Sequence, residues 1–147
     1  MGTAIDHVVL WVEDAPRAVE FYTRVIGLAP VRLEEFLAGA APFPSVRVAE
    51  GSILDLVPRA GADAVQAYVG ASRPTGAGRP INHVCLSMDR PAMEALAARL
   101  DAAGVPRTTH PERSYGARGW TVDWFYLQDP DGNVVEIRTY DPPRDPR

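Results

Sequence analysis

The stretch Ile5-Asp6-His7-Val8-Val9-Leu10 recurs further along the chain as Ile81-Asn82-His83-Val84-Cys85-Leu86. Only three histidines occur in the sequence, and two of them, His7 and His83, fall at matching points of this repeat. Each copy then meets an aspartate, a proline and a glycine in the same order: Asp14, Pro16 and Gly27 in the first, and Asp89, Pro91 and Gly104 in the second. An ordered repeat of this kind indicates two copies of one structural unit.

Each copy closes on an apolar stretch that carries one acid. The first is Gly51-Ser52-Ile53-Leu54-Asp55-Leu56-Val57, and the second is Gly132-Asn133-Val134-Val135-Glu136-Ile137-Arg138. Branched apolar residues dominate both stretches, which favours strands. Each half therefore places a histidine in its opening strand and a carboxylate in its closing strand.

The residues between these ends predict one helix and further strands in each half. Asp14 and Pro16 are typical of a helix start, and this helix should end at Gly27. The second helix is expected from about residue 91 to 103. Strands are expected at 5–12, 31–36, 45–49 and 53–57, and then at 81–88, 120–127 and 134–140. Each half is thus β-α-β-β-β.

These elements predict an α+β fold in which two βαβββ modules form curved mixed sheets around a metal cleft. The modules span residues 4–57 and 80–140 of a single domain over 1–147. Residues 58–79 hold glycine, alanine and proline with little periodicity and form the linker, in which 64–69 could be a short helical or extended piece. Residues 141–147 form a tail, and the polar stretch 107–119 is a candidate rim over a pocket.

Composition excludes several classes of function. The net charge is −4 and the arginines form no run, so nucleic-acid binding is not expected. All 15 basic residues are arginine, which excludes Schiff-base chemistry and a phosphate-loop lysine. Cys85 is the single cysteine, and no secretion signal or membrane-spanning run is present, so a cytoplasmic location without membrane contact is expected.

The four donor side chains of the repeat favour a metal site. If a pseudo-twofold axis relates the halves, His7, His83 and Glu136 come together with Asp55 nearby. Imidazole and carboxylate ligands on strands suit divalent Fe, Mn, Ni, Co or Zn and leave positions open for a small-molecule substrate. The alternative is that both histidines are core residues satisfied by neighbours while the two acids are solvated. Asp55 has a shorter side chain than glutamate and could instead support a ligand or be exposed.

Other residues near these strands have two interpretations each. Tyr126 could reach a metal-bound substrate oxygen or simply fill the core. Arg138 shares the face of Glu136 and could contact an anion, although an exposed edge arginine is the more ordinary interpretation. His110 could act as a general base or lie on the surface, and Cys85 is more simply an inert filler. Three tryptophans are expected to pack, with one lining the pocket: Trp11, Trp120 and Trp124.

The chain as a whole resembles the vicinal oxygen chelate superfamily, which includes glyoxalase I, extradiol dioxygenases and bleomycin-resistance proteins. Three stretches carry the resemblance, namely Ile5-Asp6-His7, the run from Glu20 to Leu28, and Phe125-Tyr126-Leu127-Gln128-Asp129-Pro130-Asp131-Gly132-Asn133-Val134-Val135-Glu136. The resemblance implies paired βαβββ modules around a divalent metal, bound by His7, His83 and Glu136 with Asp55 as a fourth ligand. It also implies a substrate-contacting role for Tyr126 and a homodimer in which ligands could come from two subunits.

Departures from the family's branches decide between reactions. Tyr68 stands where extradiol dioxygenases carry an acid/base histidine, which disfavours ring cleavage. Glyoxalase I uses two glutamates, one as a base, and Asp55 is a shortened replacement for one of them. We therefore expect a metal-dependent enzyme that chelates a small oxygen-rich substrate, with lyase or isomerase chemistry ahead of dioxygenase chemistry and with Glu136 and Tyr126 as catalytic residues. The alternative is a metal-free protein that sequesters a small molecule, as bleomycin-resistance proteins do.

Overall fold

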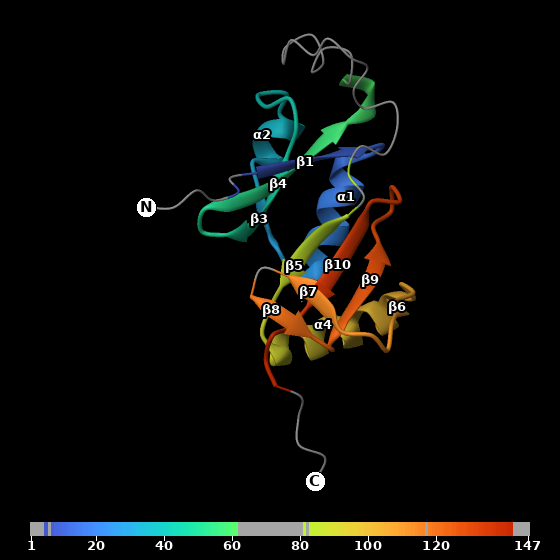
Figure 1. Cartoon of the computed structure of the whole chain (residues 1–147). Helices are drawn as coiled ribbons and strands as arrows, with labels where there is room; N and C mark the ends of the chain where they lie inside the picture. Colours follow the sequence, from blue (N-terminus) through green and yellow to red (C-terminus); the bar gives the residue numbers. More distant parts are fainter. Residues whose placement is uncertain (1–4, 6, 62–80, 82, 117, 143–147) are drawn as a thin grey trace. The chain divides into compact units, whose positions relative to one another are not determined.

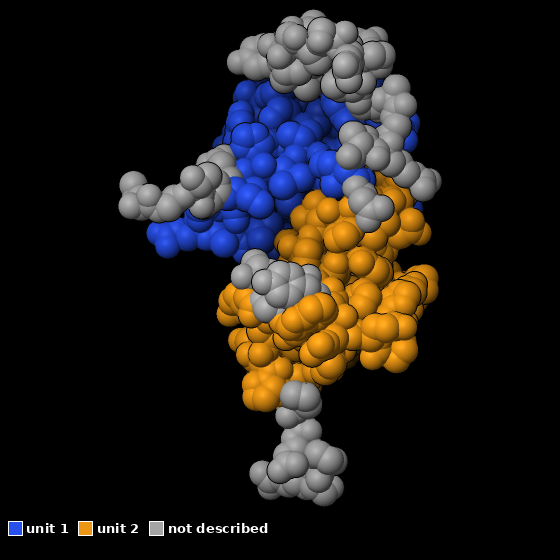
Figure 2. Space-filling model, viewed as in Figure 1, with its two compact units in different colours: residues 1–82 blue, residues 83–147 orange. Residues whose placement is uncertain are grey.

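The computed structural model describes residues 5, 7–61, 81, 83–116 and 118–142. It divides into two compact units, unit 1 at Met1–Asn82 and unit 2 at His83–Arg147 (Figure 2). Each unit contains a four-stranded mixed sheet and an amphipathic helix (Figure 1). The α+β fold class and the duplication predicted from the repeat are therefore confirmed.

Unit 1 has the sheet order β1-β4-β3-β2. Strand β1 pairs in parallel with β4, while β3 lies antiparallel to both β4 and β2. The elements in chain order are β1 (His7–Val12), α1 (Ala15–Phe21), the π-helical turn η1 (Tyr22–Ile26), β2 (Ala29–Val31), α2 (Leu33–Leu37), β3 (Ser45–Ala49), β4 (Ser52–Pro58) and the 3₁₀ turn η2 (Arg59–Gly61).

Unit 2 repeats this arrangement with the sheet order β5-β10-β9-β6. Again the opening and closing strands, β5 and β10, pair in parallel, and β9 lies antiparallel between β10 and β6. A separate hairpin of β7 and β8 precedes β9. The elements are β5 (Val84–Ser87), α4 (Arg90–Ala103), β6 (Thr108–Thr109), β7 (Ser114–Gly116), β8 (Gly119–Thr121), β9 (Trp124–Gln128) and β10 (Val134–Arg138).

Equivalent caps begin and end the helix of each unit. The Asp14 Oδ1 atom accepts a hydrogen bond of 2.9 Å from the Arg17 amide, and the Asp89 Oδ1 atom accepts one of 2.9 Å from the Ala92 amide. Gly27 has φ of 93° and Gly104 has φ of 66°, a left-handed conformation that glycine adopts without strain. The predicted starts and ends of both helices are confirmed.

The strands of each sheet place mainly apolar side chains on one face and the histidine and acid of the repeat on the other, which is called the open face although its acids are themselves buried. In unit 1 the buried face includes Leu10, Val46, Leu54 and Leu56, and α1 contacts β4. In unit 2 the buried face is supplied by Leu86, Phe125, Leu127, Val135 and Ile137, while Leu96 and Leu100 of α4 are also fully enclosed. Residues two apart share a face, so the histidine and acid of each repeat lie on the open faces.

Two strand predictions were wrong in part. Residues 31–36 do not form one strand, because β2 ends at Val31 and α2 begins at Leu33 after Arg32 turns through a positive φ of 58°. Residues 120–127 are divided between β8 and β9, with a break at 122–123. The piece expected at 64–69 lies outside the described residues, and no described helix is long and apolar enough to cross a membrane.

Hydrogen bonds from Arg90 join the start of α4 to the segment that follows β10. The Arg90 amide donates to Asp141 Oδ2 at 2.6 Å, and the Arg90 guanidinium donates to Asp123 Oδ2 at 2.5 Å and to the Pro142 carbonyl at 2.9 Å. This arginine thus joins the start of α4 to the segments on either side of β9 and β10. Arg90 and Asp123 thus form a semi-buried arginine–carboxylate pair in unit 2.

Candidate metal centre

The open face of the second sheet is centred on Glu136 of β10. Glu136 lies opposite Cys85 of β5 on one side and opposite Tyr126 of β9 on the other. His83 comes directly before β5 and is two residues from Cys85, so it belongs to the same face by strand periodicity. The repeat's second histidine, its acid and Tyr126 are therefore brought together within one unit.

The Glu136 carboxylate is buried, with 3% of the residue exposed, and both of its oxygens are engaged. Its Oε2 atom lies 3.1 Å from His83 Nε2. Its Oε1 atom accepts a hydrogen bond of 2.9 Å from Arg138 Nε and a second, short one from Arg138 Nη2. Such pairing offsets the cost of removing a charged carboxylate from water.

Arg138 is buried as well, contrary to the interpretation of an exposed edge arginine. Its Nη2 atom also donates to Ser114 Oγ at 2.8 Å, and its Nη1 atom donates to the Tyr140 hydroxyl at 3.3 Å. The reason is the spacing, because an acid and an arginine two residues apart in a strand share one face and can pair there. Arg138 therefore belongs to the candidate site.

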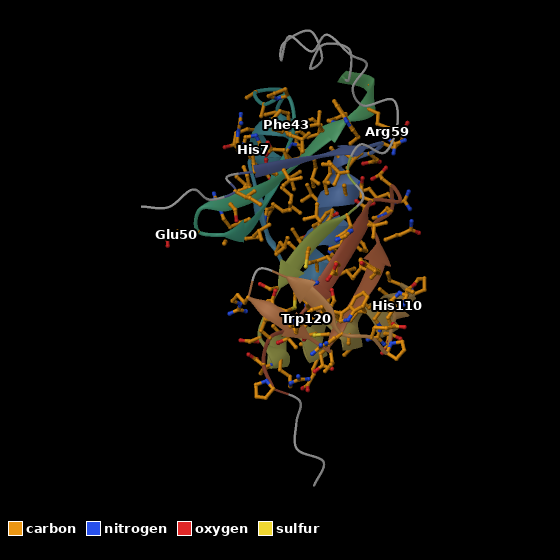
Figure 3. The ribbon with its side chains drawn as sticks, in the orientation of Figure 1. His7, Phe43, Glu50, Arg59, His110 and Trp120 are labelled. Carbon is orange, nitrogen blue, oxygen red and sulfur yellow. The ribbon has the colours of Figure 1, made fainter. Side chains whose placement is uncertain are left out.

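Aromatic rings lie near this buried carboxylate. Tyr126 makes edge contacts with His83, at 5.4 Å between ring centroids, and with Trp124, at 5.3 Å. His110, seen beside β6 and β9 in Figure 3, stacks on Trp124 at 5.1 Å with an angle of 13° between the rings. Partial burial and the negative charge of Glu136 raise the pKa of Tyr126, so its phenol stays protonated and can donate a hydrogen bond at neutral pH.

Unit 1 places the other two candidate ligands on the open face of its own sheet. Asp55 of β4 lies opposite Val9 of β1, and His7, two residues before Val9, shares that face by strand periodicity. His7 is exposed, whereas Asp55 is 7% exposed and its Oδ1 atom accepts a hydrogen bond of 2.6 Å from Ser45 Oγ. Asp55 is thus neither solvated nor unpaired, and Ser45 holds one of its oxygens.

The geometry of the His83–Glu136 pair fits two ligands of one cation. Ligand atoms that each lie about 2.1 Å from an ion, at the right angles of octahedral coordination, are about 3.0 Å apart. The Nε2–Oε2 separation of 3.1 Å is compatible with this and is also that of a direct hydrogen bond. A neutral imidazole nitrogen and a carboxylate oxygen are donors that suit Zn²⁺ and neighbouring transition metals. Among the described residues no group of three or more His, Cys, Asp or Glu side chains gathers around one point. Metal binding by His7, Asp55, His83 and Glu136 stays a prediction.

Comparison with known proteins agrees with the duplicated fold. Residues 4–137 match the Glyoxalase/Bleomycin resistance protein/Dioxygenase superfamily. The chain belongs to this superfamily. The resemblance to the vicinal oxygen chelate superfamily, which three stretches of the sequence carry, is thereby confirmed.

Individual members of the glyoxalase superfamily are similar along nearly the whole chain. The virulence protein STM3117 of Salmonella typhimurium is 28% identical over 137 residues, which cover 92% of this chain and 83% of that protein. The lactoylglutathione lyase of Escherichia coli O157:H7 is 26% identical over 137 residues, with coverage of 89% and 88%. The crystal structure of STM3117 aligns with a TM-score of 0.66 at 23% identity, covering 96% of this chain and 99% of that one, which supports the fold.

The sequence indicates His7, His83, Glu136 and Asp55 as candidate metal ligands, but it does not reveal all the residues that contact the two acids. The pairing of Arg138 with Glu136 could have been predicted from their spacing of two residues along one strand. Ser45 contacts Asp55 and Ser114 contacts Arg138, and neither serine carried such a signal, since each lies ten or more residues from its partner in the sequence. Tyr68, which argued against ring cleavage, lies outside the described residues.

Cys85 lies on the same open face and is exposed, so it is not the buried filler expected from sequence. Partial desolvation of the sulfur and the nearby Glu136 carboxylate raise the pKa of its thiol from 9.0 to about 11. In metal-free protein at pH 8, we expect its thiolate fraction to be about a hundredfold below that of an ordinary cysteine, because 11 minus 9.0 is 2 pH units. Alkylation by iodoacetamide, followed by mass spectrometry, should therefore be slow and should keep accelerating above pH 9.

Cys85 is the single cysteine, so Cys85→Ser gives the background of this measurement. Adding urea provides an internal comparison. Unfolding separates the Cys85 sulfur from Glu136 and exposes it to water, so the thiol should regain the reactivity of an ordinary cysteine. An alkylation rate that levels off near pH 9 in the folded protein would contradict the proposed surroundings of the sulfur.

Proposed function

We propose that this glyoxalase superfamily member is a divalent-metal-dependent enzyme that chelates a small oxygen-rich substrate. The observation that supports it most is the convergence of His83 Nε2 and Glu136 Oε2 at 3.1 Å on an open sheet face. The proposed ligands are His83 and Glu136 of unit 2 with His7 and Asp55 of unit 1, taken from one chain or from two chains of a homodimer. Fe, Mn, Ni, Co and Zn all suit this donor set.

The chemistry divides between the metal and the residues beside it. When bound, the metal would act as a Lewis acid that polarises neighbouring oxygens of the substrate. The Tyr126 phenol, kept protonated beside Glu136, would donate a hydrogen bond to a substrate oxygen and orient it. Glu136 would be held in place at the reacting centre because Arg138 fixes its other oxygen.

Lyase or isomerase chemistry is favoured over dioxygenase chemistry in this proposal. Lactoylglutathione lyase is among the curated relatives that match most of the chain. Tyr68 replaces the histidine that the resemblance associates with ring cleavage. An assay for isomerisation or carbon–sulfur bond formation on 2-oxoaldehydes mixed with thiols is therefore the first activity screen, with O₂-dependent oxidation of catechols as the second.

Metal binding itself is tested by elemental analysis and by chelator competition on the purified protein. We expect a divalent ion in the unsubstituted protein and a loss of affinity of at least about a hundredfold in His83→Ala, since a ligand contributes more than the supporting groups around it. His110→Ala is the matched control, because His110 stacks on Trp124 and is not a proposed ligand. Absence of any tightly bound divalent ion in the unsubstituted protein would end the proposal.

The alternative function is metal-free sequestration of a small molecule, and the rings of His110, Trp124 and Tyr126 favour it. Such a cluster offers flat apolar surface to an aromatic ligand. A titration with an aromatic cationic drug such as bleomycin, followed by tryptophan fluorescence, discriminates between the two. Tight binding that His7→Ala and chelators leave unchanged would favour sequestration over the enzyme.

A further inference from the structure

Arg138 contacts one oxygen of Glu136, and the other oxygen lies 3.1 Å from His83 Nε2. Both guanidinium hydrogen bonds to the carboxylate end on Oε1, while Oε2 faces His83 Nε2. The guanidinium is held in turn by Ser114 and Tyr140, so its direction is set from two further sides. The described contacts therefore make the two oxygens of Glu136 unequal.

We propose that Arg138 is a positioning residue that restricts Glu136 to metal coordination through Oε2 alone. This inference rests on the metal-dependent function proposed above and specifies how one ligand of that site is presented. A carboxylate without such a partner can turn about its terminal bond and bind a cation through both oxygens. The Arg138 guanidinium is planar and permanently charged. By occupying Oε1 it prevents Glu136 from binding the metal through both oxygens, which would keep a coordination position for substrate.

Arg138 also connects this carboxylate to the β7–β8 hairpin. Its Nη2 atom reaches Ser114 at the start of β7, and the hairpin is further fixed by Thr121 Oγ1, which donates to the Thr139 carbonyl at 2.6 Å. The Arg118 amide donates to the Tyr140 hydroxyl, which itself accepts from Arg138. The hairpin and the candidate ligand thus share one guanidinium.

The metal arm of the test uses Co²⁺ alone as the probe, because its visible absorption reports coordination number. In Arg138→Met, Glu136 is released and can bind through both oxygens. We expect the Co²⁺ affinity to fall about tenfold or more, as for other groups that orient a ligand, and the visible bands to weaken as the coordination number rises. Arg138→Lys keeps the positive charge but not the paired N–H donors of a guanidinium, and it should restore part of the Co²⁺ affinity.

Arg90→Met is the matched control for the loss of a semi-buried arginine. Arg90 pairs with Asp123 at 2.5 Å in the same unit, but none of its described hydrogen bonds involves Glu136. We expect Arg90→Met to keep the Co²⁺ spectrum and affinity of the unsubstituted protein. Circular dichroism of each variant confirms that unit 2 is folded before titration.

A second readout needs no metal. Losing a charged hydrogen bond to Ser114 should speed amide exchange in residues 114–121 by about tenfold in Arg138→Met, with no such change in Arg90→Met. Co²⁺ binding by Arg138→Met with unchanged spectrum and affinity within about twofold would overturn the positioning role alone. Failure of the unsubstituted protein to bind Co²⁺ would instead overturn the proposed function, and the positioning role with it.

Discussion

Replacing Glu136 with leucine is expected to lower the free energy of unfolding of the metal-free protein by about 3–5 kcal/mol. The side chains of Glu136 and Arg138 are 3% and 5% exposed, so the variant leaves a guanidinium in the sheet without its carboxylate. An ionised group removed from water and deprived of its partner accounts for the size of this effect. Urea denaturation in the presence of EDTA, followed by circular dichroism, measures it.

Glu20→Leu is the control for this substitution. Glu20 pairs with Arg24 at 3.0 Å on the outside of the first helical segment, with side chains 58% and 79% exposed. An exposed pair of this kind contributes about 0–1 kcal/mol, so the control should lose little stability. The contrast between the two glutamates isolates burial as the cause.

The double variant Glu136→Leu/Arg138→Met separates the cost of an unpaired charge from the loss of a stabilising pair. Removing both charges leaves no ion without a partner, so most of the lost stability should return. If the double variant were as unstable as Glu136→Leu alone, packing rather than charge would be responsible. A loss below about 1 kcal/mol in Glu136→Leu would show that water reaches Arg138.

The repeat in the sequence was sufficient to predict the main helix of each unit and a strand at the start and at the end of each unit. Asp14 and Asp89 as caps, and Gly27 and Gly104 as ends, are local signals that tertiary structure did not override. At residues 33–37 a local signal was misjudged. Leu33, Glu34, Glu35 and Leu37 are good helix formers, and this preference prevailed over the expected strand.

The partner of Asp55 depended on strand register, which no local signal fixes. A simple two-residue turn at Glu50-Gly51 would continue the Ala49–Ser52 pairing and set Ser45 opposite Leu56. A bulge between Arg47 and Ala49 shifts the register by one and sets Ser45 opposite Asp55 instead. That shift puts the serine on the open face, where its hydroxyl holds the carboxylate. The joint ligand set of His7, Asp55, His83 and Glu136 stays a prediction.

Leu56→Ala is expected to destabilise unit 1 by about 2–5 kcal/mol. Leu56 is completely buried and lies in β4, which pairs with β1 on one side and with β3 on the other. Its amide donates to the Pro44 carbonyl at 3.0 Å, so the surrounding backbone is fixed and cannot collapse into the space left by the side chain. The residual cavity adds to the lost transfer free energy.

Leu37→Ala makes the same chemical change where burial is absent. Leu37, the last residue of α2, is 59% exposed, and its truncation should change stability by less than about 0.5 kcal/mol. Urea titration of both variants by circular dichroism compares them directly. Asp55 precedes Leu56 and lies on the opposite face of β4. A loss of stability in Leu56→Ala that leaves the contact between Ser45 and Asp55 intact would therefore show that the core can be weakened independently of this candidate ligand. Equal effects at Leu56 and Leu37 would instead contradict the assignment of β4 as the central, enclosed strand of this sheet.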